Sequence, residues 1–141
     1  MPGIDECLSE AMSLPGARGA SLVDWTSGLA LGTAGESPVG DHETTAAETA
    51  ELARAAAEYD SFATTEAKQV GEPPVQAGEL TKGPPVEDLI VTTRGGYHVL
   101  RFVETAFDSS VFLHLWLDRD TGNLALARIR LRDLAERLVL G

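Results

Sequence analysis

The segment Ser110–Asp118 constrains the fold most strongly. Its central run, Val-Phe-Leu-His-Leu-Trp-Leu, is apolar at almost every position and is too short for a buried helix. A strand that is apolar on both faces must be covered on both faces, because neither face can be left to water. We therefore expect a β-sheet with helices packed on each of its sides.

Two glycine-containing turns predict the other strands of this sheet. In the first turn, Gly28 supplies the positive φ that a tight hairpin needs, and in the second Gly95 and Gly96 follow Arg94. The expected hairpins join Ala20–Trp25 to Leu29–Leu31 and Glu87–Thr93 to Tyr97–Glu104. With Ser110–Asp118 they make one antiparallel sheet of five strands.

Three segments carry helical patterns. Apolar residues recur at helical spacing in Ile4–Leu14, which Pro15 and Gly16 end. Asp41–Tyr59 is rich in alanine and glutamate without an internal glycine or proline, and Leu124–Leu138 places its apolar residues on one face. The order α-β-β-α-β-β-β-α predicts an α/β fold, a sandwich of the α+β type.

The helix at Asp41–Tyr59 bears a stripe of small residues that allows close approach of another backbone. The stripe comprises Ala46, Ala50, Ala53 and Ala57, and a neighbouring stripe comprises Leu52, Ala56 and Tyr59. The alanines pack either on the chain's own sheet or against a second subunit. If they form a subunit interface, a charged residue at Ala50 or Ala53 should weaken a dimer and leave the fold intact.

At 141 residues the chain is expected to form one domain, residues 1–141. The segment Ser61–Pro85 contains three glycines and two proline pairs but no sustained periodicity, so we expect a long flexible connection at about 61–85. Such a connection is either functional or disordered, and the sequence does not decide between them.

The net charge of −11 excludes a surface that binds nucleic acid, because phosphate binding needs clustered lysine and arginine. Residues 1–91 hold 16 acidic and 4 basic side chains, whereas residues 92–141 hold 6 acidic and 7 basic ones.

The single cysteine, Cys7, excludes an internal disulfide and is expected to be buried. Without a signal-peptide pattern or an apolar run of about 20 residues, we expect a cytoplasmic chain that is not inserted in a membrane.

The order of these elements resembles the Roadblock/dynein light-chain family, especially its small stand-alone bacterial members of the actinobacterial type. The hairpin Leu22-Val-Asp-Trp-Thr-Ser-Gly-Leu-Ala-Leu31 and the ending Arg119-Asp-Thr-Gly-Asn-Leu-Ala-Leu-Ala-Arg128 carry the resemblance. It implies a profilin-like sandwich and a homodimer built by an edge strand and the central helix. The interface would then include Ala46, Ala50, Ala53, Ala57, Leu89, Ile90, Val91, Thr92 and Thr93. The Ser61–Pro85 connection departs from the family pattern.

No motif in the sequence predicts catalysis, a cofactor or a metal site. His98 and His114 fall on adjacent predicted strands where their imidazoles can meet, and we interpret them as packed, hydrogen-bonded residues. His42 lies next to Asp41 and Glu43, and adjacent helical residues do not share a face. The segment that starts at Asp118 resembles a calcium loop but lacks its later acidic ligands. No phosphate-binding loop occurs, so the chain is not itself a P-loop GTPase.

The resemblance and the lack of catalytic motifs together lead to one main hypothesis. The chain is expected to be a non-catalytic dimeric scaffold that binds and regulates a small Ras-like GTPase in a bacterial signalling system. The alternative is a small-molecule sensing or general protein-interaction adaptor module, in which His98, His114 and Trp116 line a ligand site.

Overall fold

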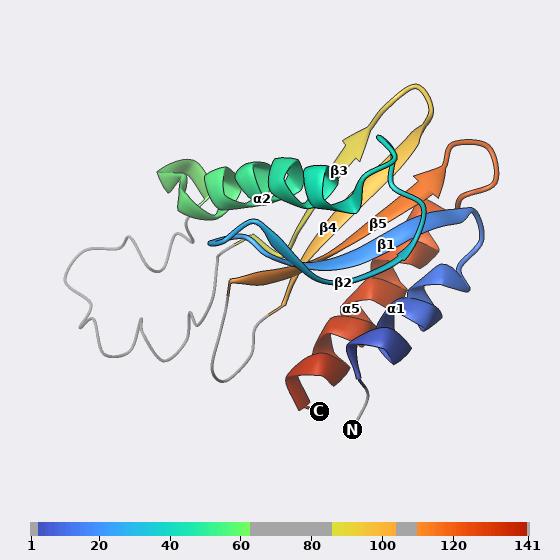
Figure 1. Ribbon diagram of the computed structural model, residues 1–141, viewed down its shortest axis with the longest axis horizontal. Helices are drawn as coiled ribbons and strands as arrows, with labels where there is room; N and C mark the ends of the chain where they lie inside the picture. Colours follow the sequence, from blue (N-terminus) through green and yellow to red (C-terminus); the bar gives the residue numbers. More distant parts are fainter. Residues whose placement is uncertain (1–2, 63–85, 104–109, 141) are drawn as a thin grey trace.

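A single antiparallel sheet of five strands organises the structure, a computed structural model that describes residues 3–62, 86–103 and 110–140. The spatial order is β2-β1-β5-β4-β3, so that β5 is the central strand (Figure 1). The strands are β1 (Ala17–Asp24), β2 (Leu29–Gly35), β3 (Asp88–Thr92), β4 (Gly96–Val103) and β5 (Val111–Asp118). The most apolar segment therefore lies where both of its faces are covered.

Helices cover both faces of the sheet (Figure 1). The helix α2 (His42–Glu58) lies on one face, and α1 (Ile4–Met12) and α5 (Leu124–Leu140) lie side by side on the other. A short 3-10 turn, η1 (Asp60–Phe62), follows α2. This arrangement confirms the predicted α/β sandwich, its antiparallel five-stranded sheet and its order of elements.

The strands divide their side chains between two hydrophobic cores because successive residues point to opposite faces. Val111, Leu113 and Leu115 of β5 face α1 and α5, whereas Phe112 between them faces α2. Phe112 and Leu113 are 0% and 1% exposed, so β5 is buried from both sides.

Local sequence signals set the helix and turn boundaries. The side chain of Asp41 accepts a hydrogen bond from Glu43 N and caps α2, and Asn123 Oδ1 accepts one from Leu126 N at the start of α5. Gly28 has φ +79° in the first hairpin turn, as expected. Gly16 has φ +76°, and a Cβ there would lie 2.5 Å from Gly122 Cα, so only glycine fits.

Some predicted boundaries were wrong by a few residues. β1 begins at Ala17, three residues before the predicted start. β2 continues to Gly35, because glycine in β2 serves packing and does not end the strand. A Cβ at Gly32 would lie 2.5 Å from Ile4 Cγ2, so this glycine lets α1 approach the sheet. α1 ends at Met12, two residues before the predicted end. Residues 63–85 of the predicted flexible connection lie outside the described residues.

Candidate functional site

The two histidines on adjacent strands form a pair on the α2 side of the sheet. His98 Nδ1 and His114 Nε2 share a hydrogen bond of 2.9 Å, and their nearly parallel rings meet edge to edge with centroids 5.2 Å apart. The strand register explains this contact, since His114 lies opposite Leu100 and next to the pair formed by His98 and Trp116. The predicted approach of the two imidazoles is confirmed.

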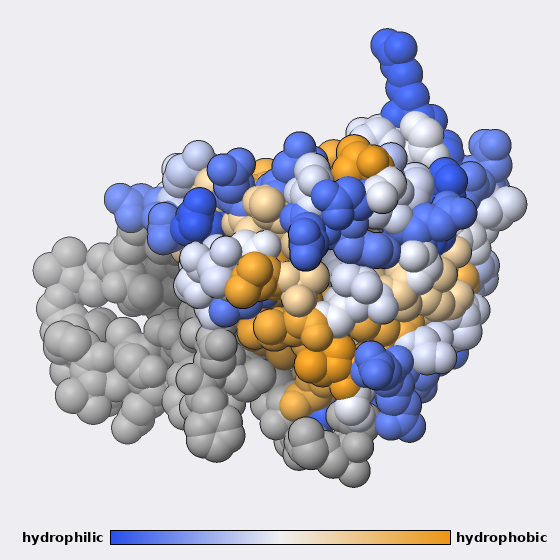
Figure 2. Space-filling model, in the orientation of Figure 1, coloured by the Kyte–Doolittle hydropathy of each residue, from blue (hydrophilic) through white to orange (hydrophobic). Residues whose placement is uncertain are grey.

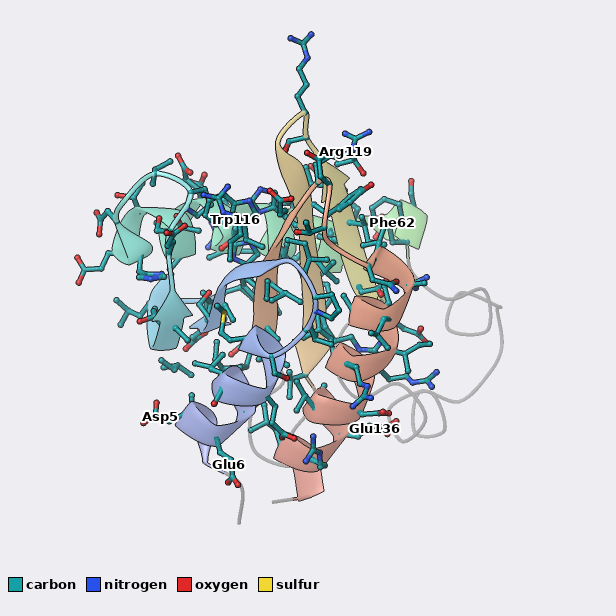
Figure 3. All side chains as sticks on the ribbon, turned by 90° about the vertical axis from the view of Figure 1, so that its right-hand side faces the viewer. Asp5, Glu6, Phe62, Trp116, Arg119 and Glu136 are labelled. Atoms are coloured by element: carbon teal, nitrogen blue, oxygen red, sulfur yellow. The ribbon has the colours of Figure 1, made fainter. Side chains whose placement is uncertain are left out.

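Trp116, which is labelled in Figure 3, and Arg18 extend this pair into a cluster of four side chains. The His98 ring is nearly parallel to the Trp116 ring at 6.2 Å, and Arg18 Cζ lies 4.0 Å from the centre of the Trp116 ring system. The Arg18 guanidinium also donates to Glu36 Oε1 at 3.2 Å. The cluster therefore joins β4, β5 and β1 to the segment that leads into α2.

Burial keeps the histidine pair uncharged. It lowers the pKa of His114 to about 3, with smaller contributions from electrostatic interactions with His98 and His42. Burial also lowers the pKa of His98. No carboxylate contacts either imidazole among the described residues, so neither ring has the charged partner that orients a catalytic histidine. The two imidazoles are therefore packed and hydrogen-bonded to each other, as the sequence predicts.

The alanine stripe faces the sheet of its own chain. Ala46, Ala50 and Ala53 are 1%, 2% and 0% exposed and pack with Val23 and Phe112, while Ala57 packs partly buried at the rim. Of the two packing modes that the sequence left open, the structure shows this one. The expectation that a charge at Ala50 or Ala53 would spare the fold is wrong, because it would be buried within the subunit. On the neighbouring stripe, Leu52 and Tyr59 are exposed and Ala56 is buried.

The predicted interface residues of β3 lie on an open edge of the sheet. β3 pairs with β4 from Asp88 to Thr92 without a register shift, and Ile90 and Val91 are 38% and 36% exposed. The opposite edge, β2, differs: the β1–β2 register shifts at Leu22, and His42 Nε2 donates to Gly35 O at 3.0 Å. A bulge and a capped carbonyl discourage pairing with another strand, so β3 is the better edge for pairing.

The remaining chemical candidates have structural roles. Asp118 Oδ2 accepts hydrogen bonds from Asp120 N and Thr121 N in the turn before α5, as a turn-forming aspartate does. Cys7 is buried, as predicted, and its burial raises the pKa of the thiol to about 11.

Within residues 3–62, 86–103 and 110–140, no group of three or more potential ligands could hold a metal ion. Across these same ranges, no helix is long and apolar enough to cross a membrane.

Sequence reasoning missed the arginine contacts of the site and of the sheet edge. Arg18 covers Trp116, Arg128 binds Asp88 of β3, and Arg119 Nη1 donates to Thr93 O just after β3. The two residues of each contact are between 26 and 98 positions apart in the chain, so no local sequence pattern predicts these contacts. The excess of arginine in residues 92–141 was the only available signal.

One helix on one face of a five-stranded antiparallel sheet and two on the other define the Roadblock/LC7 class of α/β fold. The sequence matches no family model and no curated protein. Comparison with solved structures identifies the fold across nearly the whole chain.

The similar structures include two bacterial MglB proteins and a Roadblock/LC7 domain. MglB of Myxococcus xanthus has a TM-score of 0.67 and 18% identity, with 96% of this chain and 91% of that chain covered. The Roadblock/LC7 domain from Streptomyces avermitilis has a TM-score of 0.63 and 16% identity over 95% and 92% of the chains. The gliding protein MglB from Thermus thermophilus has a TM-score of 0.65 and 19% identity over 96% and 85%. The chain therefore has the Roadblock/LC7 fold.

Proposed function

We propose that this chain is a cytoplasmic, non-catalytic scaffold of the Roadblock/dynein light-chain family that forms a homodimer and regulates a small Ras-like GTPase. The observation that carries the proposal is the likeness to MglB and Roadblock/LC7 structures over more than nine-tenths of this chain.

The dimer is proposed to form through Leu89, Ile90, Val91, Thr92 and Thr93 at the β3 edge, where two copies would pair into one continuous sheet. The straight register of β3 and the exposure of Ile90 and Val91 support this choice. Because Ala46, Ala50 and Ala53 are buried, we propose that α2 contributes the exposed side chains beside the alanine stripe, such as Leu52. A similar solved structure is described as MglB with a tetrameric arrangement, which supports self-association.

The excess of acidic side chains in the first part of the chain indicates which kind of partner surface would bind it. Along residues 3–60, eleven acidic side chains accompany only Arg18 and Arg54, and Arg18 is already paired with Glu36. Such a surface attracts a partner with basic groups around its contact area. The scaffold would then favour one conformation of the GTPase switch regions by contacting them.

Light scattering at micromolar concentration tests the dimer. We expect twice the chain mass of 14.9 kDa for the natural chain and a shift to 14.9 kDa for Ile90→Asp, because the new charge would lie at the pairing edge. Leu29→Asp is the matched control, since Leu29 is 64% exposed on the opposite edge strand. A monomeric natural chain, or equal effects of the two variants, contradicts the proposed interface.

Pull-down with small GTPases encoded in the same genome tests the partner, each loaded in turn with GTP and GDP. The proposal expects binding that differs between the two nucleotide states. No binding in either state removes it. A small GTPase encoded next to this chain would be the first candidate.

The cluster of Arg18, Trp116, His98 and His114 favours small-molecule sensing as a second candidate function. Trp116 and His98 are only partly buried, and we propose that a planar ligand would contact these two rings. A thermal-shift screen tests it, because a ligand of the native state raises the melting temperature. A hit that Trp116→Leu leaves unchanged would contradict this site.

A further inference from the structure

The edge strand β3 has little apolar attachment to the rest of the molecule. Three of its five residues, Ile90 to Thr92, are exposed, and within the described residues only Leu89 of this strand packs against a hydrophobic core. In the part of the chain that the structure describes, its one strand neighbour is β4. An edge strand of this length frays easily unless other contacts hold its ends.

Arginines from α5, from β4 and from the turn that follows β5 supply contacts at both ends of β3. At its start, Arg128 of α5 binds Asp88 with two hydrogen bonds, Nε to Oδ2 at 2.9 Å and Nη2 to Oδ1 at 3.3 Å. After its end, Arg119 Nη1 donates to Thr93 O at 2.8 Å. Arg101 of β4 lies farther away, with Nη1 4.0 Å from Glu87 Oε1.

The contact between Arg128 and Asp88 is the strongest of these three. It is bidentate, and the Asp88 side chain is only 12% exposed although Arg128 is 49% exposed. A carboxylate with so little access to water depends on its partner, and it must turn outward if that partner is removed. Because Asp88 is the first residue of β3, such a turn would release the start of the strand.

We propose that Arg128 is a positioning residue for the assembly edge, where its bidentate contact with Asp88 holds β3 straight enough to pair with a second copy. The inference rests on the proposed pairing through β3. Arg128 would thus give α5 a role in assembly, although this helix packs on a face of the sheet and does not itself pair with the second copy.

Arg137 provides a matched control on the same helix. Its Nη2 lies 2.9 Å from Glu10 Oε2, the same length as the shorter Arg128 contact, and its side chain is 50% exposed. Its partner belongs to α1 and is 46% exposed. Arg128→Gln and Arg137→Gln therefore remove similar charges from α5, and only the first releases β3.

Two measurements on the full chain test the proposal: amide hydrogen exchange in β3 and the dimerisation constant from sedimentation. For Arg128→Gln we expect exchange of the β3 amides and the dimer dissociation constant to rise by about tenfold, with changes of less than about twofold for Arg137→Gln. The melting temperatures of the two variants should be similar. Arg128→Lys should restore only part of the effect, because lysine keeps the charge and loses the bidentate geometry.

The outcomes separate this proposal from the proposed dimer. If Arg128→Gln leaves the dissociation constant unchanged while Ile90→Asp raises it, the positioning role is overturned and pairing through β3 stands. If Ile90→Asp also leaves the constant unchanged, pairing through β3 fails and this inference fails with it. Equal effects of Arg128→Gln and Arg137→Gln overturn it as well.

Discussion

Lowering the pH should destabilise the folded chain through His114, at pH values where the aspartates are still ionised. The pKa of His114 falls from 6.5 to about 3 on folding, chiefly because the imidazole is buried. Between these values the unfolded chain binds a proton that the folded chain excludes, so the free energy of unfolding decreases as pH falls through this window. The slope is about 1.4 kcal/mol per pH unit, so lowering pH from 6.5 to 5 removes roughly 2 kcal/mol. The stabilisation is fully present above pH 6.5.

Urea unfolding between pH 7 and 5 measures this loss while carboxyl groups of ordinary pKa remain mostly ionised. His114→Gln should flatten the pH dependence, because glutamine does not titrate and can still hydrogen-bond to His98. Leu29→Gln, which introduces the same residue at an exposed position of β2 without a titratable group, is the control and should keep the slope. An unchanged slope in His114→Gln would refute the assignment of the acid loss to this buried ring.

Three further predictions follow from burial and backbone geometry. The Cys7 thiol, with its pKa raised to about 11, should react with a thiol reagent at pH 8 only after denaturation, and rapid reaction of the folded chain would contradict its burial. Gly16→Ala should lower the free energy of unfolding by about 1 kcal/mol or more, measured by urea unfolding, because its φ is +76° and Gly122 leaves no room. Ala50→Asp should unfold the chain, seen as loss of helical circular dichroism, because Ala50 is 2% exposed. A folded Ala50→Asp monomer would contradict the packing of α2.

Regular patterns made the fold predictable from sequence. The two-sided apolar character of Ser110–Asp118 predicts the central strand β5, and Gly28 predicts the first hairpin turn. The apolar stripe of α5 and the approach of His98 to His114 follow from the same periodicities of helix and strand. Each of these features depends on neighbours in sequence or on simple strand pairing.

The site was less predictable because its contacts join distant segments. The alanine stripe of α2 fits two packing partners equally well, and only the structure shows that Ala50 and Ala53 face the chain's own sheet. The difference between the two sheet edges depends on a register shift in β2 and a hydrogen bond from His42. Arg128 and Asp88 lie 40 residues apart, so neither residue predicts the other.

The most direct test of the scaffold proposal is the molar mass of the chain by size-exclusion chromatography with light scattering, alone and mixed with a candidate GTPase. The account predicts twice 14.9 kDa for the chain alone and a heavier complex that forms with one nucleotide state of the GTPase in preference to the other. A mass of 14.9 kDa for the chain alone, or no heavier complex with any candidate in either nucleotide state, would contradict it.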